Sequence, residues 1–127
     1  MCKYIVVSKT FKDNDGTEFS TKGEINCKAE NLVYGVRCER CNKLLYVGET
    51  MNSLYKRHTQ NLSRIDRRNG ADAITQHFTE GQHTKEDYKI VGIEKIERND
   101  NYRKTREQFW ITKLKTLKPV GLNTKTS

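Results

Sequence analysis

The sequence contains no long apolar run, no low-complexity tract and too few acidic residues to balance its basic ones. With 127 residues and a mean hydropathy of −0.90, it offers no segment suited to span a membrane. The apolar stretch Tyr4–Val7 is too short for the core of a signal peptide. We therefore expect an intracellular protein in a reducing compartment, the nucleus or cytoplasm, and not a secreted one.

The charge imbalance is the first indication of a partner. Twenty-four basic residues against 16 acidic ones give a formal net charge of +8 and a pI near 9.4. Such a surface favours a polyanion, and nucleic acid is the first candidate, although a merely soluble basic protein is the alternative. The basic residues gather in two helix-like segments, one with Lys56, Arg57, Arg64, Arg67 and Arg68, the other with Arg98, Arg103, Lys104, Arg106, Lys113, Lys115 and Lys118.

Cysteine usage indicates metal binding. Disulfides are not expected in a chain without an export signal, so the pair Cys38 and Cys41 is either a redox dithiol or half of a metal site. Zinc prefers four nitrogen or sulfur ligands in a tetrahedron, and His77 and His83 can complete that set. Cys27 could replace one histidine, or it is a small core thiol. The redox interpretation is weak because the pair lies in a strand connection and not at a helix N-terminus.

Hydrophobic periodicity predicts the secondary structure. Extended segments are predicted at Lys3–Phe11, Thr17–Cys27, Asn31–Cys38, Leu44–Gly48 and Asp87–Ile96. Helices are predicted from Ser53 through Ile65, at Ala71–Phe78 and at Asn101–Leu117.

These elements predict a mixed α/β (α+β) fold with a small central antiparallel sheet flanked by helices. The first two extended segments form a hairpin, and Asn31–Cys38 pairs with Leu44–Gly48 through a short polar connection. A chain of this length and 34% apolar content builds one domain with a modest core. We expect a single domain over 1–127, with 1–30 as an N-terminal extension or hairpin and 124–127 as a frayed tail.

An ordered set of residues runs through these elements. Val33-Tyr34 lies on one strand, Tyr46-Val47-Gly48 on the next and Arg57 on the following helix, with Glu107 and Asn123 further along the chain. In this order the residues resemble the GIY-YIG endonucleases over Asn31–Asn123. The additional set Cys38, Cys41, His77 and His83 resembles the variant carried by Penelope-like retroelements.

Two positions depart from the pattern of the family. The first motif reads Leu32-Val33-Tyr34 in place of Gly-Ile-Tyr, which retains the tyrosine. Asn61 stands where the family often has a histidine, whereas His58 directly follows Arg57. The resemblance leaves His58 as a candidate catalytic residue in place of the missing histidine.

The carboxylate of Glu107 requires a partner even when the family resemblance is left aside. It precedes Trp110 and Ile111 by three and four residues, so it shares their apolar helix stripe. Such a carboxylate needs either an ion pair, for which Arg103 and Arg57 are candidates, or a metal. The resemblance favours a hard divalent cation, Mg²⁺ or Mn²⁺, at Glu107.

The resemblance also implies the other catalytic roles. Tyr34 would act as general base, Tyr46 would position water or phosphate, and Arg57 would donate hydrogen bonds to phosphate oxygens. Asn123 would hold the end of the chain against the site or touch phosphate, or it is a turn residue beside Gly121. The resemblance further implies that Cys38, Cys41, His77 and His83 bind a structural zinc ion.

Two functions are consistent with these candidate residues. The first is a metal-dependent endonuclease that hydrolyses phosphodiester bonds of nucleic acid, with double-stranded DNA as the expected substrate. The alternative is a zinc-stabilised nucleic-acid-binding module without cleavage activity. Both account for the charge and the zinc ligands, but only the nuclease accounts for the ordered tyrosines, arginine and glutamate.

Overall fold

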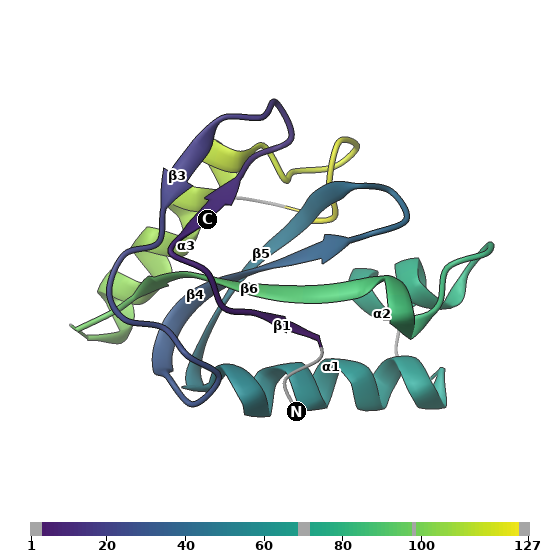
Figure 1. Cartoon of the computed structure of the whole chain (residues 1–127), viewed down its shortest axis with the longest axis horizontal. Coiled ribbons are helices and arrows are strands. Elements are labelled where there is room, and N and C mark those ends of the chain that lie inside the picture. The colour runs from purple at the N-terminus through teal and green to yellow at the C-terminus, as the bar shows by residue number, and fades with distance from the viewer. Residues whose placement is uncertain (1–3, 69–71, 98, 125–127) are drawn as a thin grey trace.

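A four-stranded sheet organises the chain in the computed structural model, which describes residues 4–68, 72–97 and 99–124. Its strands lie in the order β1-β6-β4-β5 (Figure 1). Their bounds are β1 Ile5–Val6, β4 Glu30–Cys38, β5 Lys43–Ser53 and β6 Tyr88–Lys95. The central strand β4 pairs antiparallel with β5, as predicted, and also with β6, whereas the short edge strand β1 pairs parallel with β6.

The N-terminal segment is more broken than its sequence predicts. The predicted strand Lys3–Phe11 is divided into β1 and β2 (Thr10–Lys12), and Lys3 lies outside the described residues. The predicted strand Thr17–Cys27 contains only β3 (Glu18–Ser20), which forms a hairpin with β2. The division arises because β1 pairs with β6, while β2 turns away so that Phe11 and Phe19 pack on Trp110.

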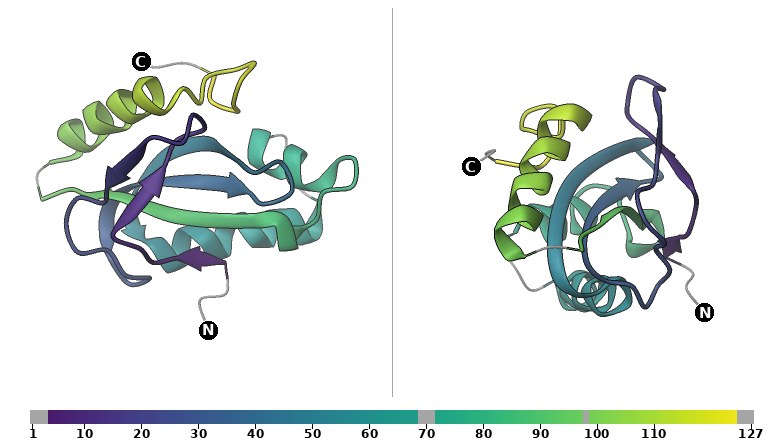
Figure 2. Two further views of the ribbon diagram at one scale, coloured as in Figure 1. Left: turned by 45° about the horizontal axis from the view of Figure 1, so that its top comes forward. Right: turned by 90° about the vertical axis from the view of Figure 1, so that its left-hand side faces the viewer.

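Three helices cover the sheet (Figures 1 and 2). They are α1 (Leu54–Arg67), α2 (Ala73–Thr79) and α3 (Asp100–Leu114), and a 3-10 turn, η1, spans Lys85–Asp87. The Ser53 side chain caps α1 by accepting a hydrogen bond from the Lys56 amide, as its position predicts. The predicted positions Ala71, Arg98 and 125–127 lie outside the described residues.

Helix α3 ends three residues earlier than predicted. Lys115 adopts the left-handed conformation, with φ of 58°, and its amide bonds back to the carbonyls of Ile111 and Thr112. This left-handed cap ends the helix at Leu114, before Pro119 can act. No helix among the described residues has the length and apolar character to cross a membrane.

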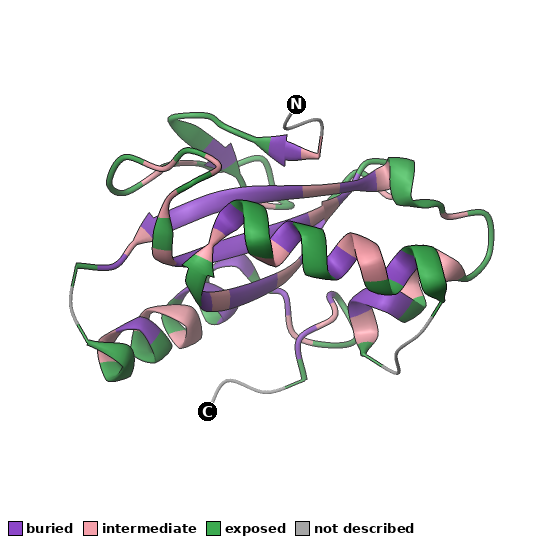
Figure 3. Ribbon diagram, turned by 90° about the horizontal axis from the view of Figure 1, so that it is seen from below, coloured by how far each residue is buried: buried purple, intermediate pink, exposed green. Residues whose placement is uncertain are grey.

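The core has two parts, one on each face of the sheet. The first packs beneath α1 and α2 and includes Leu32, Tyr34, Leu54 and Phe78. The second packs beneath α3 and the hairpin and includes Val33, Val47, Phe11, Trp110 and Leu114. Figure 3 shows the buried stripe of α1 turned toward the sheet. Because strand residues alternate between faces, Tyr34 is directed toward α1.

Candidate active site

Two tyrosines on adjacent strands form the floor of the candidate site. Tyr34 on β4 pairs with Gly48 on β5, and Tyr46 pairs with Val36, so both phenol rings lie on the α1 side of the sheet. Their ring centroids are 6.4 Å apart. A Cβ at Gly48 would lie 2.5 Å from the Tyr34 hydroxyl oxygen. The glycine two residues after Tyr46 therefore leaves the space that the Tyr34 ring occupies.

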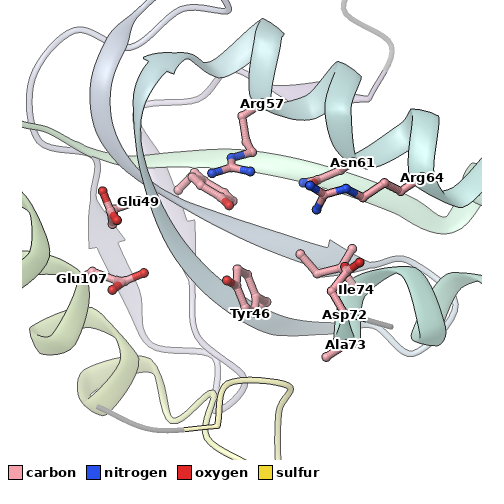
Figure 4. Close-up of a pocket in the computed structure, with 10 residues that line it drawn as sticks. Tyr46, Glu49, Arg57, Asn61, Arg64, Asp72, Ala73, Ile74 and Glu107 are labelled. Atoms are coloured by element: carbon pink, nitrogen blue, oxygen red, sulfur yellow. The ribbon is translucent and has the colours of Figure 1, made fainter. Parts of the chain in front are cut away.

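Helix α1 supplies the basic side of a pocket of about 230 Å³. The Arg57 guanidinium carbon lies 5.8 Å from the centre of the Tyr34 ring. Its buried Nε atom has no hydrogen-bond partner among the described residues. Figure 4 shows the pocket, whose lining consists of Tyr34, Tyr46, Glu49, Arg57, Asn61, Arg64, Asp72, Ala73, Ile74 and Glu107. An arginine that lines such a pocket and has a buried donor without a partner indicates an anionic ligand.

Two carboxylates, Glu49 and Glu107, lie at the end of the pocket away from Asp72 (Figure 4). Neither ion pair considered for Glu107 forms among the described residues. Arg103 binds Glu49, Asn31 and Asp100 instead, and the Arg57 guanidinium lies over the Tyr34 ring. Glu107 accepts a hydrogen bond from the neighbouring Gln108 amide.

The electrostatics of the two carboxylates differ. Burial raises the pKa of Glu107, and the negative charge of Glu49 raises it further. Although burial alone would raise the pKa of Glu49, hydrogen bonds from Arg103 and Lys104 hold that pKa below the usual glutamate value. Glu49 thus remains charged beside Glu107, and this end of the pocket would attract a cation.

Burial also raises the pKa of both phenols, of Tyr34 above all. The neighbouring phenol of Tyr46 adds to the effect at Tyr34, whereas the positive charge of Arg57 opposes it. In the protein alone both hydroxyl groups are therefore protonated at neutral pH. Ionisation of Tyr34 would require further positive charge in the pocket.

The structure corrects the position of His58. This buried side chain does not line the pocket but packs against the rings of Tyr4, Tyr55 and Tyr88. Successive residues on a helix point about 100° apart, so His58 cannot share the direction of Arg57. Burial lowers the pKa of His58, as expected for a neutral imidazole in an aromatic cluster.

Asn123 holds the C-terminal segment against β5. Its side-chain amide accepts a hydrogen bond from the Val47 amide and donates one to the Val47 carbonyl. Its oxygen also accepts from the Thr116 hydroxyl, and the side chain is buried. Of the roles considered from the sequence, the structure favours the one in which Asn123 fixes the chain beside Tyr46 and Gly48.

Several pocket residues were not identified from the sequence as site residues. Glu49 directly follows the Tyr46-Val47-Gly48 motif, and a carboxylate next to that motif is a signal that could have found it. Asn61 is buried one helical turn after Arg57 and donates a hydrogen bond to the Tyr88 hydroxyl. Arg64 and Asp72 carry no such local signal, because their place depends on how α1 and α2 pack.

A second cluster, 38–41 with 77–83, brings together the four residues predicted to bind zinc. The ligand atoms of Cys38, Cys41, His77 and His83 all lie within 4.8 Å of one another. The Cys41 sulfur is 3.2 Å from Nε2 of His83 and 3.7 Å from Nε2 of His77. Ligands at about 2.3 Å and 2.0 Å from a tetrahedral zinc ion have similar separations. Cys27 does not belong to this cluster.

Comparison with known proteins identifies the family and the fold of the chain. Residues 30–123 match the family model of the GIY-YIG catalytic domain. The catalytic domain of homing endonuclease I-TevI has the same fold, with a TM-score of 0.63 and 20% identity over 76% of this chain and 99% of that one. No curated protein matches the sequence. The predicted mixed α+β class is confirmed, and because the family model covers most of its length, the chain belongs to the GIY-YIG catalytic domain family.

Proposed function

We propose that this protein is a divalent-metal-dependent endonuclease that hydrolyses phosphodiester bonds of double-stranded DNA. Membership of the GIY-YIG family implies a nuclease that acts on nucleic acid. The observation that carries the proposal is the single pocket shared by Tyr34, Tyr46, Arg57 and Glu107, which lie on four different elements. This pocket combines hydroxyl groups, a guanidinium group and a carboxylate, the groups that phosphodiester cleavage requires.

The chemistry of Glu107 fits a hard divalent cation, Mg²⁺ or Mn²⁺. Burial and the charge of Glu49 both disfavour its ionised form, and a cation would offset both effects. One carboxylate with waters and substrate phosphate oxygens is a usual coordination for Mg²⁺. When bound, such a cation supplies positive charge beside the phosphate and favours ionisation of nearby water and phenol groups.

The residues of the chain then act on the phosphate and on the attacking water. Arg57 donates hydrogen bonds to non-bridging phosphate oxygens, where negative charge develops in the transition state. The Tyr34 oxygen, once ionised, takes the proton of the attacking water as the water oxygen bonds to phosphorus. The bond from phosphorus to the leaving sugar oxygen breaks, and that oxygen takes a proton from solvent. The Tyr46 hydroxyl orients that water or the phosphate, and Glu107 holds the cation. Asn123, whose side-chain amide is hydrogen-bonded to the Val47 backbone, keeps β5 in place.

The cluster of Cys38, Cys41, His77 and His83 is proposed to hold a structural zinc ion, as in the Penelope-like variant. Four protein ligands close a tetrahedral site and leave no position for substrate. Zinc binds thiolates, so this proposal agrees with a reducing compartment, the nucleus or cytoplasm.

Incubation of supercoiled plasmid DNA with the protein and Mg²⁺ or Mn²⁺ tests the function. We expect nicked or linear plasmid from the parent protein. Glu107→Gln should reduce the rate by at least about 100-fold, because it removes the charge that holds the cation. Glu18→Gln, at an exposed position of β3, removes the same charge far from the pocket and should cut at the parental rate.

The plasmid assay also separates the two candidate functions. DNA binding without cleavage, under every divalent metal condition, would support the zinc-stabilised binding module. Cleavage by Glu107→Gln near the parental rate would show that the cation is held elsewhere. Thermal unfolding of each variant, followed by circular dichroism, establishes that a loss of cleavage is not a loss of fold.

A further inference from the structure

The outward face of α1 forms a basic surface beside the proposed active site. A shallow groove of about 640 Å³ follows this face from the N-cap to the last turn of the helix. Its lining contains three cationic side chains and no carboxylate: Ser53, Tyr55, Lys56, Thr59, Gln60, Ser63, Arg64 and Arg67. Its hydroxyl, amide and cationic groups can all donate hydrogen bonds, which suits a polyanion.

Arg64 connects this groove to the active-site pocket, because it lines both. Arg57 and Arg64 are seven residues apart, about two turns, so they share one edge of the helix. Lys56 and Arg67 lie on the solvent side of that edge. Figure 4 shows Arg64 beside Asn61 on the pocket side of α1. The groove and the pocket are therefore one continuous surface.

The cations of the groove are not neutralised by the protein. Lys56, Arg64 and Arg67 are exposed, and none forms an ion pair with another described residue. Asp66, the acidic residue of the helix, binds Lys85 instead. Three unpaired positive charges beside one pocket indicate an external anion with several charges in a row.

A smaller cleft of about 270 Å³ lies on the other side of the pocket. It is lined by Lys104, Thr105, Glu107 and Gln108, and it shares Glu107 with the pocket. The pocket thus lies between two depressions. The larger one contains three cationic side chains, and the smaller one contains one, Lys104, which is paired with Glu49. This arrangement suits a polymeric ligand that passes through the pocket better than a small ligand that is held entirely within it.

We propose that the outward face of α1 binds the sugar-phosphate backbone of the substrate beside the bond that is cut, without reading the base sequence. This inference rests on the proposed function, since the pocket locates the scissile phosphate. The helix has 14 residues and is about 21 Å long, which matches about six phosphates of one strand. Contacts of this kind fix the position of the nucleic acid but carry no sequence information.

The test is the salt dependence of DNA binding, measured by fluorescence anisotropy with a labelled duplex and no added Mg²⁺ or Mn²⁺. Arg64→Gln combined with Arg67→Gln should weaken binding roughly tenfold near 0.1 M salt and lower the slope of log K against log salt by about 2. The loss should be equal for two duplexes of unrelated sequence. The Arg64→Lys and Arg67→Lys pair should retain most of the affinity.

The matched control removes two charges from the opposite side of the molecule. Lys9→Gln with Lys12→Gln, on and next to the hairpin strand β2, lowers the net charge equally and should leave the affinity within about twofold. An unchanged slope in the α1 variant, or an equal loss in the control, would overturn the proposal. If the parent protein cuts no plasmid but the α1 variant still loses affinity, the proposed cleavage fails while the backbone contact stands.

Discussion

Gly48 and Tyr34 illustrate how a single backbone position determines the geometry of the pocket. Gly48 lies opposite Tyr34 in the β4–β5 register, and the absence of a side chain lets the phenol ring lie across β5. A Cβ there would approach the Tyr34 oxygen to 2.5 Å and Tyr46 Cε2 to 2.9 Å. Both are well inside ordinary van der Waals contact. The glycine of the Tyr46-Val47-Gly48 motif is thus required by packing.

Gly48→Ala should therefore displace Tyr34 and reduce cleavage. We expect a rate loss of about 100-fold, as for a catalytic group moved by about 1 Å, and a stability loss of about 1–3 kcal/mol from overpacking. Single-turnover cleavage rates and urea unfolding measure the two effects. Tyr34→Phe is the companion variant, since it removes the hydroxyl and keeps the ring. A Gly48→Ala protein that cuts at the parental rate would contradict this account of the motif.

At the scale of elements, Arg103 connects α3 to two strands of the sheet. Arg103 is 4% exposed and binds Glu49 on β5 and Asn31 on β4, as well as Asp100 on its own helix. Glu107 follows Arg103 by one helical turn, so both lie on the same side of α3. The contact of Arg103 with the sheet therefore sets the depth at which Glu107 enters the pocket.

Glu49→Gln should destabilise the protein in a pH-dependent way. The pKa of Glu49 is lower in the folded chain than in the unfolded one, so its charge stabilises the fold above the unfolded pKa. That contribution is lost as pH falls through the folded pKa. We expect the variant to be less stable by about 1–3 kcal/mol at pH 7 and the difference to shrink steadily below about pH 4.

Urea unfolding at a series of pH values, with parent and variant side by side, measures this difference. Glu39→Gln is a matched control, because Glu39 is half exposed and forms a surface ion pair with Arg37. Its effect should stay within about 0.5 kcal/mol at every pH. A difference between Glu49→Gln and the parent that is independent of pH would contradict the role assigned to the charge of Glu49.

At the scale of the whole molecule, the cysteine and histidine cluster joins distant parts of the chain. Cys38 ends β4 and Cys41 lies in the β4–β5 connection, whereas His77 belongs to α2 and His83 follows it. A metal here would link β4 and the β4–β5 connection to the segment that contributes Asp72 and its neighbours to the pocket. In a chain with a small apolar core, such a cross-link would contribute a large share of the stability.

Elemental analysis of protein purified without added metal should therefore find one zinc ion per chain. Chelation should lower the unfolding free energy by about 4 kcal/mol or more, the value for a ligand present at a thousand times its Kd. Cys41→Ser and His83→Ala should each lose the zinc, because each removes one of four ligands. Cys27→Ser is the control and should retain it. Zinc that persists in both ligand variants would refute the site.

The sequence by itself determined the elements whose signals are local. β-branched and aromatic residues identified β4 and the start of β5, a three-to-four period identified α1 and α3, and the order of the tyrosines, Arg57 and Glu107 indicated the family. Residue type and periodicity can be read from short stretches of the chain, which is why these predictions succeeded. The candidate metal ligands Cys38, Cys41, His77 and His83 could also be proposed from residue type and spacing.

The tertiary structure alone decided which side chains face the pocket. It places Glu49, Arg64 and Asp72 in the pocket and packs His58 in an aromatic cluster. It pairs Arg103 with Glu49 and not with Glu107. It also divided the first predicted strand and paired β1 parallel to β6. These features depend on contacts between residues far apart in the chain. The free energy of such contacts cannot be inferred from a short stretch of sequence.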